Sequence, residues 1–189
     1  MIYVVIPTTP GRRERLQKCL DALRKSTVSH CAVIYENTDG GCVLAQRRAI
    51  SGLHGLIFFL NDDMIVEPEC LGRLLESYLH HFPAHDGICQ PDDNYHAGGL
   101  ATAPFGHSDT LRPFLAHYTH YFWDTELTAV MQRAGKYVIV SDARLDHQHH
   151  TKGRSPLDET YERTGRNFEA DREIFRRREA AGFPKGAAA

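Results

Sequence analysis

Asn61, Asp62 and Asp63 form an acidic turn directly after the apolar residues 56–60. A short apolar run of this kind is typical of a buried strand, and in open α/β sheets ligands bind beyond the carboxyl ends of strands. Two adjacent carboxylates repel each other unless a cation or water lies between them. A divalent cation prefers carboxylate oxygens and keeps positions open for phosphate oxygens, so the turn suggests a metal-assisted phosphate site. The alternative is a solvated turn, because Asn and Asp are common turn residues.

The elements that must position this turn follow from hydrophobic spacing. Four short apolar runs predict buried strands, over residues 2–6, 32–35, 56–60 and 137–140. Apolar residues at helical spacing predict helices after Pro10, over 43–50, from 67, from 124 to 135, and from Ser155 onward. Residues 86–118 are interrupted by Gly and Pro, and short strands with a long loop are expected there. Alternation of strands and helices predicts a single α/β domain with right-handed crossovers.

Composition limits the classes of function. The chain has 189 residues, 42% of them hydrophobic, and a formal net charge of −2, which indicates a folded protein without a strongly basic nucleic-acid surface. No apolar run reaches the ~18 residues of a transmembrane helix, so no membrane insertion is expected. The five cysteines are odd in number and form no Cys-x-x-Cys pair, which favours a reducing compartment and a cytoplasmic location.

Six segments, in order along residues 1–150, resemble the nucleotide-sugar glycosyltransferases of the GT-A fold, particularly glycosyltransferase family 2. The acidic turn resembles their Asp-x-Asp motif, although its first residue is Asn61. The other five are the opening strand with Arg12-Arg13-Glu14-Arg15-Leu16, the acidic loop 36–40, the helix 45–50 and two later pieces, Trp123-Asp124-Thr125-Glu126-Leu127 and 141–147. Of these two pieces, 123–127 resembles a Glu-Asp-x-Asp-Leu segment, with Trp123 in place of its Glu. The piece 141–147 resembles a strand that ends in a metal-binding histidine.

The resemblance implies a fold and a division of the chain. The expected fold is a GT-A (Rossmann-like) α/β domain, with a mixed, mostly parallel sheet flanked by helices. Residues 1–150 form the glycosyltransferase domain, with 1–95 as the nucleotide-binding half and 96–150 as the acceptor and metal half. Residues 151–185 are expected to be a C-terminal helical extension that packs on this domain.

The resemblance also assigns roles to individual side chains. Those expected near the nucleotide sugar are Thr8, Thr9, Glu36, Arg47, Asn61 and Asp62. Asp63 and His147 are expected to bind a divalent cation, Mn or Mg. Because His147 is followed by Gln148, His149 and His150, the alternatives are a zinc site or an exposed loop.

Asp124 is the candidate catalytic base, because a carboxylate within reach of an acceptor hydroxyl takes its proton as the hydroxyl attacks. Glu126 is the second candidate. The alternative for Asp124 is a helix N-cap, and Trp123, which cannot replace a carboxylate, is a candidate for stacking on a sugar face.

These observations lead to one expected function and two alternatives. The expected function is metal-dependent transfer of a sugar from a nucleotide sugar to an acceptor hydroxyl with inversion of the anomeric centre, and a UDP sugar is the expected donor. The acceptor is left open among a glycan, a small molecule, a protein and a modified nucleic-acid base. The alternatives are a nucleotide- or sugar-binding module without activity, and a nucleotidyltransferase on a similar sheet, which lacks support because no Gly-rich phosphate loop occurs.

Overall fold

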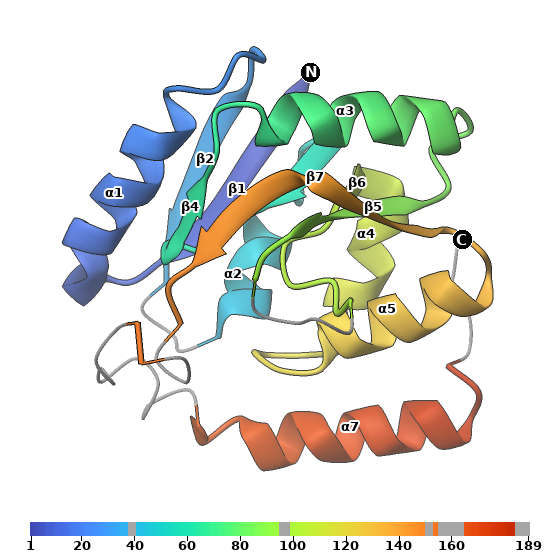
Figure 1. Ribbon diagram of the computed structural model, residues 1–189. Coiled ribbons are helices and arrows are strands. Elements are labelled where there is room, and N and C mark those ends of the chain that lie inside the picture. The colour runs from blue at the N-terminus through green and yellow to red at the C-terminus, as the bar shows by residue number, and fades with distance from the viewer. Residues whose placement is uncertain (38–40, 95–98, 150–152, 155–164, 184–189) are drawn as a thin grey trace.

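The computed structural model describes residues 1–37, 41–94, 99–149, 153–154 and 165–183, and within them a seven-stranded sheet runs through the molecule (Figure 1). The order of strands across the sheet is β2-β1-β3-β6-β5-β7-β4. The bounds are β1 Ile2–Thr8, β2 Cys31–Glu36, β3 Leu56–Phe59, β4 Met64–Val66, β5 Ile88–Asp92, β6 Phe105–His107 and β7 Tyr137–His147. A 3-10 helix η1 (Pro10–Arg12) precedes the helices α1 Arg13–Leu23, α2 Cys42–Ala49, α3 Cys70–His81, α4 Ser108–Leu115, α5 Trp123–Arg133 and α7 Phe168–Ala180.

The sheet is mixed, as the sequence predicts. β1 pairs in parallel with β2 and β3, and β5 pairs in parallel with β7. β6 runs antiparallel to β3 and β5, and β4 runs antiparallel to β7. Parallel pairs are thus half of the pairs between described strands, a smaller share than expected. The carboxyl ends of β1, β2 and β3 meet at one edge, where the acidic turn begins.

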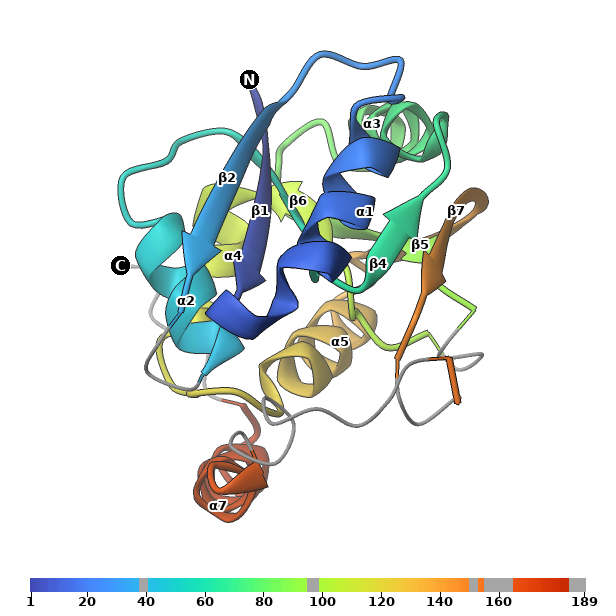
Figure 2. The ribbon, with the colours of Figure 1, turned by 90° about the vertical axis from the view of Figure 1, so that its left-hand side faces the viewer.

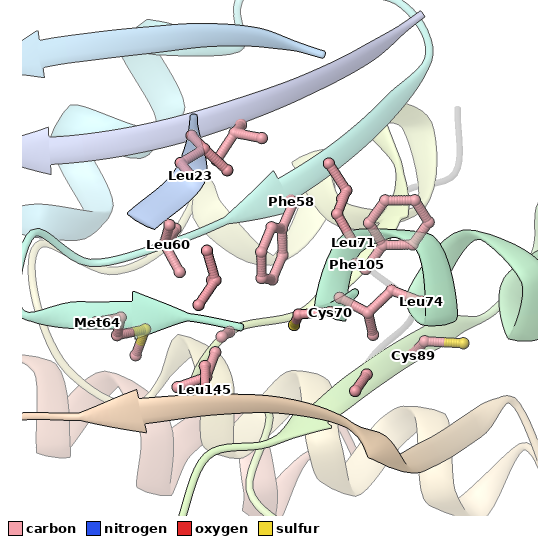
Figure 3. Packing of buried hydrophobic residues seen from close by; sticks show 14 of the residues in the cluster. Leu23, Phe58, Leu60, Met64, Cys70, Leu71, Leu74, Cys89, Phe105 and Leu145 are labelled. Atoms are coloured by element: carbon pink, nitrogen blue, oxygen red, sulfur yellow. The ribbon is translucent and has the colours of Figure 1, made fainter. Parts of the chain in front are cut away.

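The apolar strands β1 and β3 are buried on both faces, which confirms that part of the prediction. Successive side chains of a strand point to opposite faces, so Val4 and Phe58 join one core cluster while Val5 and Phe59 join the other. The first cluster packs under α1 and α3, and Figure 3 shows Leu23 and Leu74 from these helices around Phe58. The second cluster packs against α2, α4 and α5, so helices cover both faces of the sheet (Figures 1 and 2).

Two elements differ from the expectation. The segment 86–118 contains α4 besides two short strands; its buried residues Leu111, Phe114 and Leu115 have helical spacing, but Pro113 inside the helix obscures the pattern. The strand predicted over 137–140 continues through His147 as β7.

At the C-terminal end, α7 lies beyond α5 on the side away from the sheet in both views (Figures 1 and 2). Its described part begins at Phe168, and the predicted helix start at Ser155 falls outside the described residues. Ile174 and Phe175 of α7 pack against the second core cluster.

The edge strand β2 is unusually open. Its first residue, Cys31, is exposed, and Ile34 is 46% exposed. Cys19, Cys70 and Cys89 are buried, in contrast. Within the described residues, no helix has the length and apolar character required to cross a membrane.

Candidate active site

The acidic turn lies at the carboxyl end of β3 and is deeply buried. Asp62 is 1% exposed and Asp63 is 4% exposed, so neither carboxylate belongs to a solvated turn. Thr8, the last residue of β1, donates its hydroxyl hydrogen bond to Asp62 Oδ2 over 2.8 Å. The parallel pairing of β1 and β3 brings Thr8 and Asp62 together although 54 positions separate them. The structure therefore rules out the solvated-turn alternative.

Arg12 compensates the charge of the turn, a role that the sequence analysis did not assign. Its Nη1 atom lies 2.7 Å from Asp62 Oδ1, and its Nη2 atom lies 3.3 Å from Asp63 Oδ2. Burial raises the pKa of Asp62 to about 6, although the Arg12 guanidinium and the Thr8 hydroxyl bond oppose this shift. One arginine from η1 thus bridges both carboxylates. The signal was its position just after the first strand, at the edge where the turn lies.

His147 faces Asp63 from the far end of the sheet. It is the last residue of β7 and pairs in register with Met64 of β4, directly after the turn. His147 Nε2 lies 3.5 Å from Asp63 Oδ1, and the backbone N–H of Gln148 donates to the Asp63 carbonyl over 2.8 Å. The two predicted metal ligands therefore come together across 84 residues of sequence.

A divalent cation fits this pair in chemistry. One carboxylate oxygen and one imidazole nitrogen, both on buried side chains, are ligands that Mn accepts. In the described part of the chain, however, no three His, Cys, Asp or Glu side chains gather closely enough to hold a metal by themselves. The remaining ligands would have to come from phosphate oxygens and water.

Asp93 is a further buried carboxylate at this site, and the sequence analysis missed it. It follows β5, and its Oδ2 atom lies 4.0 Å from His147 Nδ1. The Thr102 hydroxyl donates to Asp93, and Gln90 Nε2 donates to that hydroxyl over 3.2 Å. The 4.0 Å between Asp93 and His147 exceeds the length of a hydrogen bond, so the contact is electrostatic and places a second carboxylate beside the His147 ring. The pair Asp92-Asp93 was the available signal, although Gln90 and Pro91 interrupt the apolar residues before it.

Asp124 is the second residue of α5 and is half-buried. The helix N-cap is Phe122, so the prediction that Asp124 caps the helix is wrong. Its Oδ1 atom accepts the Thr125 backbone N–H over 2.8 Å, and burial raises its pKa to about 6. Burial raises the pKa of the Cys42 thiol to about 12, and the carboxylates of Asp124, Asp171, Asp62 and Asp63 add to this shift. The Asn37 backbone N–H and side-chain amide donate to the Thr8 and Gly41 carbonyls, each over 2.8 Å, so the N-terminus of α2 lies beside Thr8 and the acidic turn. His120, four residues before Asp124, accepts the Cys42 N–H at the same helix end, so Asp124 also lies near it.

Glu126 does not have the environment of a catalytic base. It is 1% exposed and accepts a 2.6 Å hydrogen bond from the Tyr118 hydroxyl. Arg178 of α7 binds both of its oxygens, with Nε 2.7 Å from Oε2 and Nη2 2.6 Å from Oε1. This bidentate pair makes Glu126 the anchor of α7 and leaves Asp124 as the candidate base.

The other predicted residues occupy varied positions. Glu36 is exposed at the end of β2, opposite Thr8 in the β1–β2 register. Thr9, which follows β1, and Asn61, the first residue of the acidic turn, are half-buried. Arg47 lies on the exposed side of α2 and donates to the Ala116 carbonyl over 3.0 Å. His149 packs against the His147 ring, with centroids 5.4 Å apart, whereas His150 and residues 38–40 lie outside the described residues.

Trp123 does not offer its face to a sugar. It is 4% exposed, and its ring packs edge-to-face on Phe59 at 5.4 Å. The stacking role expected for Trp123 is therefore wrong, because its ring is packed in the hydrophobic core.

Comparison with known proteins supports the fold. No protein-family model matches the sequence, and no curated protein is significantly similar to it. Among solved structures, glucosyl-3-phosphoglycerate synthase from Mycobacterium tuberculosis, in complex with Mn²⁺, UDP-glucose and phosphoglyceric acid, is 13% identical with a TM-score of 0.60, covering 98% of this chain and 81% of that one. Mannosyl-3-phosphoglycerate synthase from Rubrobacter xylanophilus is 12% identical with a TM-score of 0.57, covering 100% and 77%.

Residues 1–349 of S. aureus TarS are also 12% identical with a TM-score of 0.57, covering 76% of this chain. The match spans 59% of that TarS fragment. At these identities the likeness establishes the fold alone: the chain has the GT-A fold of these proteins, which confirms the fold predicted from the sequence.

Proposed function

We propose that this protein is a glycosyltransferase that moves a sugar from a nucleotide-sugar donor, a UDP sugar, to an acceptor hydroxyl. The observation that carries the proposal is the convergence of Asp63 and His147, 3.5 Å apart, at the carboxyl edge of a GT-A sheet. The mycobacterial structure of the same fold is a complex with Mn²⁺ and UDP-glucose, and TarS has been solved with UDP.

Asp63 and His147 would hold a Mn or Mg ion, which when bound would neutralise negative charge on a diphosphate. Arg12 adds a fixed positive charge at the same place and keeps Asp62 and Asp63 oriented through both of its terminal nitrogens. Asp93 adds a second negative charge beside the other ring nitrogen of His147, 4.0 Å away. Glu36, at the end of β2, is the candidate for hydrogen bonds from uracil N3–H or from ribose.

Asp124 would act as the base. The acceptor oxygen forms a bond to the anomeric carbon, the bond from that carbon to the diphosphate oxygen breaks, and the hydroxyl proton passes to the Asp124 carboxylate. UDP leaves with the electron pair, and a single displacement inverts the anomeric centre. With a pKa of about 6, Asp124 is mostly ionised at neutral pH yet remains a better proton acceptor than an ordinary aspartate.

The test is calorimetric titration of the wild-type protein with UDP in the presence of Mn and again with EDTA. A UDP-release assay with UDP-glucose and UDP-GlcNAc accompanies it. Binding that requires Mn, together with slow release of UDP, supports the proposal. Absence of UDP binding under both conditions contradicts it.

A binding module without activity is the second candidate, favoured by Asn61 and by the Arg12 bridge, which balances the turn without a metal. Tight UDP binding that ignores EDTA, with no turnover of any donor, would favour that module.

A further inference from the structure

Three successive backbone amides point at one buried carboxylate from α7. Asp171, 1% exposed, accepts N–H hydrogen bonds from Thr119 over 3.0 Å, His120 over 2.7 Å and Tyr121 over 2.8 Å. Consecutive amides arranged in this way form an anion-binding concavity. Here the anion is a side chain of the protein itself, and hydrogen bonds to a charged acceptor are stronger than those between neutral groups.

The same segment, residues 119–122, also completes the N-terminus of α2. The Thr119 carbonyl accepts the Leu44 N–H over 3.2 Å, and His120 Nδ1 accepts the Cys42 N–H over 3.0 Å. These are amides of the first turn of a helix, which lack partners within the helix. The packing is close, because a Cβ on Gly41 would lie 2.3 Å from the Thr119 carbonyl oxygen.

The segment ends in an uncommon backbone conformation. Phe122 has φ +69°, a left-handed value that is unfavourable for a residue with a side chain and persists only where the surroundings enforce it. Its ring contacts Phe168 and Phe175 of α7, with both centroid distances 5.3 Å. Asp124 follows two residues later, so the direction in which α5 starts depends on this conformation.

We propose that Asp171 is a positioning residue: it fixes segment 119–122 and thereby places Asp124 at the N-terminus of α2, where the acidic turn also lies. The inference rests on the proposed function, because it concerns the base of that reaction. It assigns to α7 a part in the active site, although α7 follows the 150 residues that resemble glycosyltransferases. The competing explanation is that Asp171 merely attaches α7 to the domain.

The test compares the full-length variants Asp171→Asn and Glu173→Gln with the wild-type protein. Glu173 lies on the same helix and is exposed, so its variant makes the same change of charge without touching segment 119–122. The measurements are Kd for UDP with Mn, kcat for UDP release, and the emission of Trp123, the single tryptophan of the chain. Trp123 is the first residue of α5 and adjoins Asp124, so its emission and acrylamide quenching report the position of this helix end.

We expect Asp171→Asn to lower kcat at least tenfold, to leave Kd within threefold and to change Trp123 quenching, while Glu173→Gln changes none of the three. Unchanged kcat in a folded Asp171→Asn protein would overturn the inference, as would equal losses of kcat and affinity with unchanged Trp123 quenching. If wild-type protein neither binds UDP nor releases it from a donor, the proposed function fails first, and the inference falls with it.

A second variant protects the test against a failure of Asp171→Asn to fold. Phe168 is 38% exposed, so Phe168→Leu removes ring contacts with Tyr121 and Phe122 without opening the core. We expect a smaller loss of kcat, about threefold, with Kd unchanged and Trp123 quenching altered in the same direction. Wild-type values of kcat and quenching in Phe168→Leu, alongside an unfolded Asp171→Asn, would assign Asp171 to the attachment of α7 and overturn the proposal.

Discussion

Asp62 of the acidic turn and Asp171 of α7 are both 1% exposed, yet their charges are balanced in different ways. Asp62 is held by the side chains of Thr8 and Arg12, whereas Asp171 is held by three backbone amides. A side chain can leave its partner by rotating about its own bonds, but backbone amides of a packed segment do not reorient without moving the chain. The difference suggests that the acidic turn can exchange partners when a ligand binds, while the Asp171 cluster acts as a fixed frame.

The largest effect is expected at Asp124, the proposed base. Asp124→Asn should lower kcat for transfer or UDP release by about 10²–10⁴, because the amide cannot take a proton, with donor affinity unchanged. Rate measurements together with UDP titration check this. A variant that keeps normal rates would show that Asp124 is not the base and that segment 119–122 positions a different side chain.

Loss of the ion pair between Arg178 of α7 and Glu126 of α5 should mainly affect stability. Arg178→Met leaves Glu126 buried with an uncompensated charge, and we expect the free energy of unfolding to fall by about 3–5 kcal/mol. Urea denaturation measures the change. In the double variant with Glu126→Met most of this loss should disappear; if the double variant is as unstable as the single one, the buried charge is not the cause.

Removal of Asp63, a proposed metal ligand, should affect ligand binding at the acidic turn. Asp63→Ala should weaken Mn-dependent binding of UDP by about tenfold or more, which corresponds to at least about 1.4 kcal/mol. Calorimetric titration with Mn and with EDTA tests this, with Glu67→Ala, an exposed acidic residue just beyond β4, as the matched control. The prediction is wrong if the ratio of the two affinities is the same in Asp63→Ala and wild type.

Gly41→Ala should perturb segment 119–122 through its contact with the Thr119 carbonyl. The added methyl group meets the Thr119 carbonyl oxygen at 2.3 Å, so the backbone must shift, and a loss of about 1–3 kcal/mol in unfolding free energy is expected. Thermal unfolding gives the stability, and Trp123 quenching reports movement of the helix end. Gly52→Ala is the control, because a Cβ there meets no atom within 4 Å. Equal stability of the two variants would contradict the close packing of segment 119–122.

The smallest effect concerns pH. The folded protein raises the pKa of Asp124 from 3.8 to about 6, so the folded state holds this proton more tightly than the unfolded chain. The stabilisation is present below pH 3.8 and is lost as pH rises to 6. Asp124→Asn should therefore be more stable than wild type at pH 7, by roughly 1–2 kcal/mol, and equally stable near pH 3.5. A constant difference across this range would show that Asp124 titrates normally.

Several residues around the acidic turn could be predicted from the sequence. Apolar runs in the sequence predict buried parallel strands, and the residue that follows such a run lies at the ligand-binding edge of the sheet. Asp63 follows this rule. His147 was predicted through the family resemblance instead, and Asp93 was missed because Gln90 and Pro91 interrupt the strand before it. Arg12 was harder, because nothing in its local sequence tells a bridging arginine from its solvated neighbour Arg13.

The frame around Asp171 could not be predicted in the same way. Its partners are backbone amides 50 to 52 positions away, which carry no residue type to recognise. The left-handed conformation of Phe122 could not be predicted either, because Gly or Asn usually occupies such positions. Pairs such as Glu126 with Arg178 depend on how two helices pack, which charge spacing along one chain does not reveal.

The openness of β2 has a practical consequence for biophysical work. Burial raises the pKa of Cys19, Cys42 and Cys70 to about 12 and that of Cys89 to about 11, so these four thiols react slowly with alkylating reagents. Cys31 alone is exposed, and it begins β2 at the end opposite the acidic turn. A maleimide dye or surface tether can therefore be attached to the natural sequence at one point, leaving the carboxyl edge of the sheet unobstructed for single-molecule measurements.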